Sequence, residues 1–213
     1  METSTIVFDF GNVLIGWDPR RVYRDVLGSD SAIDAFFDEV GFAEWNLEQD
    51  RGRSWSDAVT QLAARFPHRG ELIRAFDAQW DQSITGPIEG TVRILEKLHA
   101  TGYRLIGLTN WSSDKFAMTR PRYPMFDLFE EIIVSGDVRL VKPDPEIFRL
   151  MLRLIGSTAS ECLFIDDSAA NITAAKSLGF RTIHFQEPAQ LERELREQGM
   201  LKSERYAERR PRT

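Results

Sequence analysis

A composition of 42% hydrophobic and 28% charged residues over 213 positions is that of a folded domain of ordinary size and excludes a disordered chain. The net charge of −6 offers no basic surface, so we expect neither nucleic acid nor an anionic membrane as a partner. No stretch reaches the about 20 apolar residues needed to span a bilayer, and the single cysteine, Cys162, cannot form an internal disulfide. These features indicate a cytoplasmic protein and are compatible with a monomer.

The first predicted strand covers residues 5–10, TIVFDF; its apolar run leads into a carboxylate, Asp9, just before a turn at Gly11. After residue 17 the strand pattern is lost, and helical patterns such as AIDAFFDEV and WSDAVTQLAARF take its place. An all-helical insert after the first strand is the simplest account of this change. We therefore predict an α/β core formed by 1–16 and 86–201, a helical cap at 17–85, and a polar, disordered tail at 202–213.

From residue 86 onward, short apolar runs and helical patterns alternate along the chain. The further predicted strands are 103–110, 131–136, 162–167 and 181–185, and the predicted helices are 88–102, 143–156 and 168–179. The runs are rich in Val, Ile and Phe, as expected of strands that are covered on both faces. This alternation predicts an α/β fold with a doubly wound, Rossmann-like parallel sheet and right-handed crossovers.

Polar side chains follow the predicted strands where each strand ends. In an open parallel sheet, ligands bind beyond the carboxyl ends of the strands, so these residues are candidates for a site. They are Asp9, Thr109, Asn110, Lys142, Asp166 and Asp167. Each one alone has a local explanation as a helix cap, a turn or a helix start. Their joint position at one edge favours a catalytic site.

These residue types suit the transfer of a phosphoryl group. Paired carboxylates are the ligands that Mg²⁺ prefers, together with water and substrate phosphate. One carboxylate can attack phosphorus to give an aspartyl-phosphate, and a neighbouring lysine can neutralise the phosphoryl oxygens. Backbone N–H groups in the turn at Phe10 and Gly11 can bind the remaining oxygens. We therefore expect a small phosphorylated substrate and Mg²⁺ as the cofactor.

Four motifs, in this order, resemble those of the haloacid dehalogenase (HAD) superfamily of hydrolases, whose members are mostly Mg²⁺-dependent phosphatases. The motifs are FDFGNVL, GLTN, VKPDPEIF and FIDDSAANI. The resemblance extends over residues 5–200 and includes a helical cap inserted after the first strand. Four motifs in the right order and spacing are a far more specific signal than any one of them.

The resemblance implies a role for each polar residue at the sheet edge. Asp9 would be the nucleophile, and Lys142 would bind the phosphate. Thr109 would bind the phosphoryl group, with Asn110 beside it. The metal would be held by Asp9, by the backbone carbonyl of Gly11 and by Asp167 supported by Asp166, with Asn171 one helical turn further on. For Asn171, helix capping or solvation is an equally good explanation.

Gly11 departs from the family pattern. The family's phosphatases usually carry an aspartate two residues after the nucleophile, which protonates the leaving group and then activates the hydrolytic water. A glycine keeps the backbone carbonyl for the metal but has no acid–base group. A subset of the family, typified by a sugar-1-phosphate phosphatase, has the same D-x-G-N-V turn, and this likeness implies that the turn can accompany activity.

A cap of this size commonly closes over a substrate and excludes water. The residues that we consider for contact with the substrate are Trp17, Asp18, Trp45, Glu48 and Arg51. Trp45 fits helix packing better than substrate contact, because a Trp on a helical pattern is usually buried. We expect Asp18, or another cap residue, to replace part of the missing acid function.

Three functions remain open at this point. The first is a Mg²⁺-dependent phosphatase that hydrolyses a small, sugar phosphate-like metabolite through Asp9. The second is a metal-independent 2-haloacid dehalogenase, but such members of the family have uncharged residues where this chain has Asp166 and Asp167. Since neighbouring carboxylates repel one another unless a cation is bound, this pair favours the metal enzyme. The third is a metabolite- or partner-binding protein that has lost turnover through Gly11.

Overall fold

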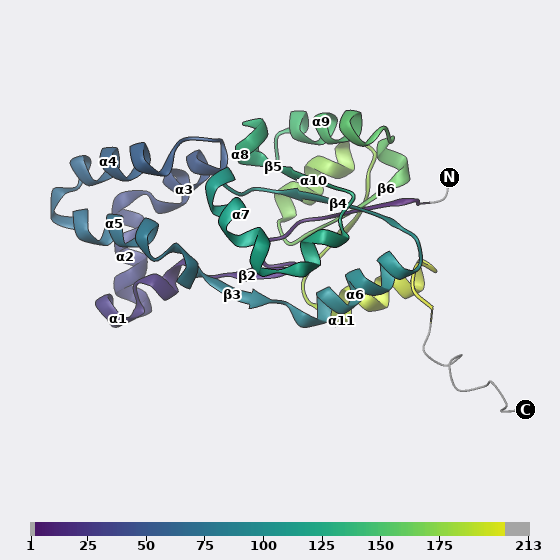
Figure 1. Ribbon diagram of the computed structural model, residues 1–213, viewed down its shortest axis with the longest axis horizontal. Coiled ribbons are helices and arrows are strands. Elements are labelled where there is room, and N and C mark those ends of the chain that lie inside the picture. Colours follow the sequence, from purple (N-terminus) through teal and green to yellow (C-terminus); the bar gives the residue numbers. More distant parts are fainter. Residues whose placement is uncertain (1–2, 203–213) are drawn as a thin grey trace, which may run out of the picture.

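A computed structural model describes residues 3–202, and a parallel sheet lies at its centre (Figure 1). The sheet has five strands in the order β5-β4-β1-β6-β7, and all neighbours are parallel. Their bounds are Thr5–Phe8 for β1, Arg104–Thr109 for β4, Glu131–Val134 for β5, Cys162–Asp166 for β6 and Arg181–His184 for β7. The predicted fold class, an α/β protein with a Rossmann-like parallel sheet and added helices, is confirmed.

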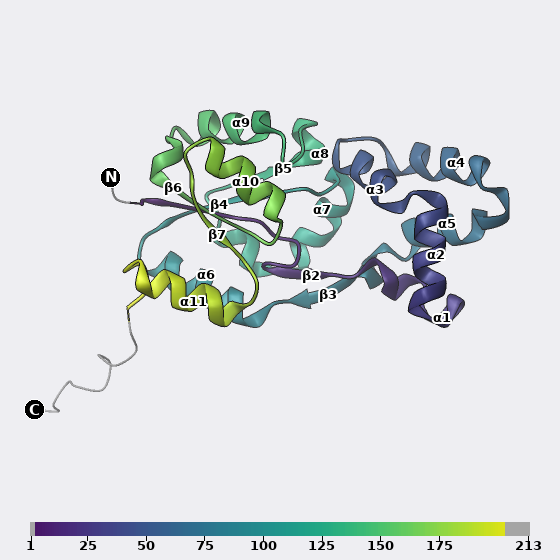
Figure 2. The ribbon, with the colours of Figure 1, turned by 180° about the vertical axis from the view of Figure 1, so that it is seen from behind.

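Helices cover both faces of this sheet, as Figures 1 and 2 show from opposite sides: α9 and α10 lie on one face, and α6 and α11 lie on the other. In β1, Ile6 and Phe8 pack into one buried cluster, while Val7 packs into a second cluster on the opposite face. All three are fully buried. Because both faces are covered, the strands appear in the sequence as continuous apolar runs.

The helices of the core alternate with its strands. Their bounds are Glu89–Ala100 for α6, Ser113–Thr119 for α7, Ser135–Val138 for α8, Pro145–Ile155 for α9, Ala169–Ser177 for α10 and Pro188–Glu197 for α11. In α9, the side chain of Asp144 accepts a hydrogen bond from the backbone N–H of Glu146 at 2.9 Å, and Pro145 occupies the first turn. The cap of α9 thus fixes the start of the helix directly after Lys142.

The chain changes direction across the sheet at β1. From β1 it proceeds to β4 and β5 on one side, and then returns to β6 and β7 on the other. Such a switch point is where open α/β sheets form their ligand sites, because the connections leave the central strand in opposite directions. The carboxyl ends of β1 and β6 therefore mark the place to look for a site.

A helical segment extends from one end of the sheet, between β2 (Ile15–Trp17) and β3 (Ile84–Pro87) (Figure 1). Its helices are α1 (Arg24–Leu27), α2 (Asp30–Val40), α3 (Phe42–Asp50), α4 (Trp55–Arg65) and α5 (Gly70–Ala78). Tyr23, Phe36, Trp55 and Phe76 are buried inside this segment, which we call the cap. Short 3-10 helices are Pro19–Val22, Pro67–Arg69, Trp80–Ser83, Arg120–Arg122, Pro124–Leu128 and Ala159–Glu161.

Strands β2 and β3 form an antiparallel two-stranded ribbon that joins the cap to the core. Our expectation of no strand between residue 17 and residue 84 was therefore wrong at its two ends. The ribbon is short and contains Gly16, Gly86 and Pro87, so it lacks the apolar run by which a strand is recognised. Both limits expected for the cap, 17 and 85, fall within this ribbon.

Helix α11 also lies outside the predicted elements.

None of the helices described for residues 3–202 is both long and apolar enough to cross a membrane. Of the tail expected at 202–213, residues 203–213 lie outside the described part of the chain.

Candidate active site

Three carboxylates meet where β1 and β6 end. In the parallel register Phe8 lies beside Ile165, and the backbone N–H of Asp9 donates to the carbonyl of Ile165 at 2.9 Å. Asp9 and Asp166, each the next residue on its strand, are thereby brought side by side. One carboxylate oxygen from each of Asp9, Asp166 and Asp167 lies within 4.8 Å of the others. Asp9 and Asp166 are buried, whereas Asp167 is exposed.

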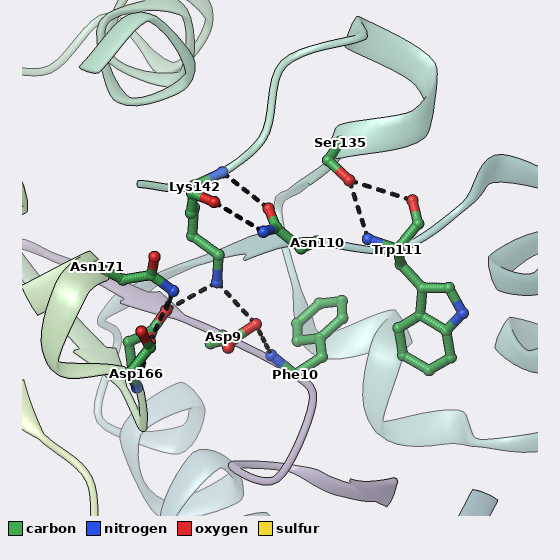
Figure 3. Close-up of polar contacts among 9 residues, drawn as sticks. Asp9, Phe10, Asn110, Trp111, Ser135, Lys142, Asp166 and Asn171 are labelled. Atoms are coloured by element: carbon green, nitrogen blue, oxygen red, sulfur yellow. Dashed lines mark hydrogen bonds and ion pairs between the residues drawn. The ribbon is translucent and has the colours of Figure 1, made fainter. Parts of the chain in front are cut away.

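Lys142 lies between two of these carboxylates (Figure 3). Its Nζ is 2.8 Å from Oδ1 of Asp9 and 2.7 Å from Oδ2 of Asp166, and its side chain is 1% exposed. Burial alone lowers the pKa of this lysine, but the charges of Asp9 and Asp166 and their hydrogen bonds leave the pKa above its usual value. Lys142 therefore carries a positive charge at the sheet edge.

Asp166 is hydrogen-bonded on both carboxylate oxygens. Its Oδ1 accepts from the backbone N–H of Ser168 at 2.8 Å and from Nδ2 of Asn171 at 3.0 Å. Its Oδ2 accepts from Lys142, and Asn171 approaches this oxygen at 3.1 Å (Figure 3). Asp166 thus holds Lys142 and the start of α10 in place. Asp167, the next residue, leaves its carboxylate exposed beside the cluster.

Asp9 has one oxygen engaged and one open. Its Oδ1 receives the Nζ of Lys142 and the backbone N–H of Phe10, the latter at 2.7 Å. Among the hydrogen bonds of residues 3–202, none reaches Oδ2. Burial raises the pKa of Asp9 to about 7; Lys142 opposes this rise, and the charges of Asp166 and Asp167 add to it. The arrangement leaves Oδ2 available to attack an electrophile.

The donor set fits a hard divalent cation. Three carboxylates face one lysine, so the cluster keeps a negative charge when all are ionised. Burial is the main cause of the raised pKa of Asp9, the neighbouring carboxylates add to it, and a cation beside Asp9 would favour its ionised form. Carboxylate oxygens with room for water and phosphate are the surroundings that Mg²⁺ prefers.

Asn110 interacts with Lys142 through the backbone. Its Nδ2 donates to the carbonyl of Lys142 at 2.9 Å, and its Oδ1 accepts from the N–H of Lys142 at 2.8 Å (Figure 3). Both ends of the amide therefore hold the segment that carries the lysine. Thr109 ends β4 and is 1% exposed. The ring of Phe10 is buried against other phenylalanine rings, so only its backbone faces the cluster.

A cavity of about 90 Å³ lies between the cap and this edge of the core. It is lined by Gly11, Trp17, Asn46, Asp50, Trp55, Trp80, Asn110, Trp111 and Ser112. At Gly11, a Cβ atom would meet nothing within 4 Å, so the position opens onto free space. On the core side, the backbone of Trp111 is bonded to the hydroxyl of Ser135, with the N–H of Trp111 donating at 2.9 Å (Figure 3).

The cap residues that we considered for substrate contact have different positions. Trp17 lines the cavity. Asp18 instead caps a 3-10 helix by accepting from the N–H of Arg20 at 3.1 Å, and it does not line the cavity. Glu48 and Arg51 form an exposed ion pair at 3.0 Å.

Trp45 packs inside the cap, as its helical pattern indicated. Its ring lies edge-on to that of Trp55 at 5.5 Å between centroids, and its Nε1 donates to the carbonyl of Ala58 at 3.2 Å. It is 7% exposed.

Asp50 is the ionisable residue of the cavity that the sequence did not point to. It is the last residue of α3, and burial raises the pKa of its carboxyl group to about 7. It directly precedes Arg51, but a single acidic residue at the end of a helix has no pattern that distinguishes it from a surface residue.

Comparison with known proteins agrees with this geometry. The sequence model of the haloacid dehalogenase-like hydrolases matches residues 3–179, which is most of the chain. The chain belongs to the haloacid dehalogenase-like hydrolases. The resemblance in the four motifs is thereby confirmed at the level of the superfamily.

Two relatives are similar to the chain over most of its length. The sesquiterpene phosphatase astK of Aspergillus oryzae is 26% identical over 183 residues, which cover 84% of this chain and 88% of that protein. The drimenol cyclase drtB of Aspergillus calidoustus is 27% identical over 196 residues, or 89% of this chain. The chain spans only 35% of the length of that cyclase.

Among solved structures, the HAD family enzyme BT-2542 of Bacteroides thetaiotaomicron has the same fold. It superimposes with a TM-score of 0.72 at 22% identity, covering 88% of this chain and 95% of that one. The wild-type BT-2542 protein has also been crystallised with magnesium and inorganic phosphate.

Proposed function

We propose that the protein is a Mg²⁺-dependent phosphatase that hydrolyses a small, sugar phosphate-like metabolite through an aspartyl-phosphate on Asp9. The observation that carries this proposal is the position of Asp9 at the switch point of the sheet, with Lys142 on one of its oxygens and the other oxygen open. Phosphatases among the relatives, and a fold neighbour crystallised with magnesium and phosphate, support the same reaction.

In the first step, Oδ2 of Asp9 attacks phosphorus and the bond from phosphorus to the leaving oxygen breaks. Lys142 and the backbone N–H of Gly11 stabilise the charge on the phosphoryl oxygens, whereas the N–H of Phe10 donates to Oδ1 of Asp9. The hydroxyl of Thr109 would bind one of these oxygens. Asn110 acts on the reaction through Lys142, because both ends of its amide hold the backbone of that lysine.

The residues that would hold Mg²⁺ are Asp9, Asp167 and the backbone carbonyl of Gly11, with Asp166 behind them. When bound, the ion neutralises charge on the phosphoryl group and aligns it with the nucleophile. Because Asp166 is already saturated with hydrogen bonds, we assign it to the support of Lys142 and assign the open ligand position to Asp167.

The size and lining of the cavity favour a substrate with a small leaving group. Its volume of about 90 Å³ is well below the roughly 300–1,000 Å³ of pockets that hold drug-sized ligands. Its walls combine indole rings, which stack on sugar faces, with the amide of Asn46, which can bind hydroxyl groups. A compact, hydroxylated alcohol fits this lining.

The test is a screen of small phosphate esters with Mg²⁺, repeated with EDTA and with the Asp9→Asn variant. We expect phosphate release by the wild-type protein that needs Mg²⁺ and that is lost in Asp9→Asn. Turnover that continues without metal or in Asp9→Asn would refute the proposal. Release of chloride from a 2-chloroacid would establish the dehalogenase instead, and a phosphorylated Asp9 that never hydrolyses would indicate a binding protein.

A further inference from the structure

The turn that follows Asp9 has no acidic side chain at Gly11 that could donate a proton. At Gly11 no side chain is present, and the space into which one would extend is open, with nothing within 4 Å of a Cβ placed there. An alkoxide is a poor leaving group, so cleavage of an alkyl phosphate needs a proton at the leaving oxygen. A donor from another element must reach this space if the protein turns over such esters.

Asp50 lies in the cavity onto which Gly11 opens. It ends α3, and the chain after it approaches the core closely. Gly52 has a φ of +91°, and a Cβ there would lie 2.9 Å from the carbonyl oxygen of Gly136, so only a glycine fits both the conformation and the space. This close contact fixes the end of α3 against the core.

Two side-chain contacts hold the cap in the same place. Nε1 of Trp55 donates to Oγ of Ser112 at 2.8 Å, and both residues line the cavity. Nζ of Lys115, on α7, lies 2.5 Å from Oδ1 of Asp77 on α5 and 4.9 Å from the ring centre of Trp55. The carboxyl group of Asp50 therefore lines a cavity whose cap side and core side are bonded to each other, and it does not depend on a loose loop for its position.

The surroundings of Asp50 allow its carboxyl group both to donate a proton and to accept one. Burial is the main cause that raises its pKa to about 7, and the charge of Asp9 adds to the rise. The backbone N–H of Ser112 and the charge of Lys142 oppose it. An acid with a pKa near the working pH is the most effective donor and acceptor in turn.

The two arginines that follow Asp50 along the chain are engaged elsewhere. Arg51 pairs with Glu48 at 3.0 Å. Arg53 donates to Oε1 of Gln49 at 2.7 Å and to the carbonyl of Trp45 at 3.0 Å. On α8 and the residue after it, Asp137 and Arg139 lie on the core side of this contact, with Arg139 packed against Gly52.

We propose that Asp50 is the general acid and base of the reaction, and that it takes the place of the side chain that Gly11 lacks; the inference rests on the proposed phosphatase function. In the first step, the proton of the Asp50 carboxyl group moves to the leaving oxygen as the bond between that oxygen and phosphorus breaks, and an alcohol is released. In the second step, the Asp50 carboxylate takes a proton from water as the water oxygen bonds to phosphorus. The bond from phosphorus to Asp9 then breaks, phosphate is released and protonated Asp50 is restored.

The test compares two substrates in the Asp50→Asn variant: an alkyl phosphate, whose leaving group needs a proton, and p-nitrophenyl phosphate, whose leaving group does not. We expect kcat/KM to fall about 10²–10⁴-fold for the alkyl ester and less than about tenfold for the aryl ester. For the aryl ester, kcat should also fall, with a burst of nitrophenol and a phosphorylated Asp9 visible by mass spectrometry, because the second step lacks its base. The decline of kcat/KM above about pH 7 expected for the alkyl ester should disappear in the variant.

Two further variants make the result specific. Glu48→Gln removes an exposed carboxylate from the same helix and should leave both substrates unaffected. Gly11→Asp places a carboxyl group in the open space by the nucleophile, and in the Asp50→Asn background it should restore much of the lost alkyl phosphatase activity.

An equal fall of kcat/KM for both esters, without a burst, would show that Asp50 only binds substrate, and it would overturn the inference. Full alkyl phosphatase activity in Asp50→Asn, alongside an inactive Asp9→Asn, would overturn the inference and leave the proposed function intact. Full activity in Asp9→Asn would overturn both.

Discussion

Replacing Lys142 by methionine, Lys142→Met, removes the only cation that the described part of the structure places in contact with Asp9 and Asp166. Its Nζ lies 2.8 Å and 2.7 Å from the two carboxylates, and its side chain is 1% exposed. Methionine has similar length and retains the packing of the stem. The variant therefore tests the charge of the lysine more than its volume.

The size of the effect follows from these distances. With an effective dielectric constant of about 20, each contact contributes about 6 kcal/mol of Coulomb attraction. The desolvation of three buried groups offsets much of this sum, and removal of one partner of a buried pair typically costs about 3–5 kcal/mol. We expect the free energy of unfolding without metal to fall by that amount at pH 7, with loss of phosphatase activity.

The assay is urea unfolding of wild type and Lys142→Met, in EDTA and in Mg²⁺. Because the variant leaves a more negative cluster, Mg²⁺ should stabilise it by more than it stabilises wild type. Lys115→Met is the matched control: Lys115 is also a buried lysine and pairs with Asp77 at 2.5 Å, away from the three carboxylates. The loss of stability caused by Lys115→Met should not depend on Mg²⁺. A Lys142→Met protein within about 1 kcal/mol of wild type in EDTA would refute this account of the cluster.

Three more results are expected. The folded-state pKa of Asp9 is raised to about 7, so this group stabilises the metal-free protein most at pH values below the ordinary aspartate pKa. This stabilisation is lost as the pH rises through about 7. Chemical unfolding in EDTA across that pH range measures the loss. Asn110→Ala breaks two hydrogen bonds to the backbone of Lys142 and should cost about 1–3 kcal/mol in chemical denaturation while lowering kcat more than it raises KM; an unchanged kcat would contradict the positioning role. Asp18→Asn should leave the pH–rate profile unchanged, since Asp18 caps a 3-10 helix outside the cavity, and a shifted profile would restore Asp18 as a candidate acid.

The core of the fold could be predicted because its strands are covered on both faces. Burial on two sides requires apolar residues at every position, as in the run from Thr5 to Phe8, and the helices between the strands end at recognisable signals such as Gly156. The ribbon of β2 and β3 lacks such signals, whereas α11 has Pro188 in its first turn and Gly199 just after its end and could have been predicted from them. The ribbon depends on pairing between residues about 70 apart, which no local pattern records.

The residues of the candidate site likewise divide into those that the sequence could predict and those that it could not. Asp9, Lys142 and Asp166 follow strands or precede a helix in the core, so their convergence follows from the parallel topology. Asp50 lies on the cap, and its position above Gly11 depends on how the cap closes on the core. Asn110 was expected beside Thr109 at this edge; that its amide is bonded to the backbone of Lys142, a partner 32 residues away, could not be seen in the sequence.

The most direct test of the proposed mechanism is to trap its covalent intermediate. Wild-type protein is mixed with substrate and Mg²⁺, quenched in acid within a single turnover, digested and analysed by mass spectrometry. We expect one phosphorylated peptide, the one that contains Asp9, which appears before phosphate is released and does not form in EDTA. Rapid hydrolysis with no phosphate on Asp9 at any time, or phosphate on another residue, would contradict the central claim that Asp9 is the nucleophile.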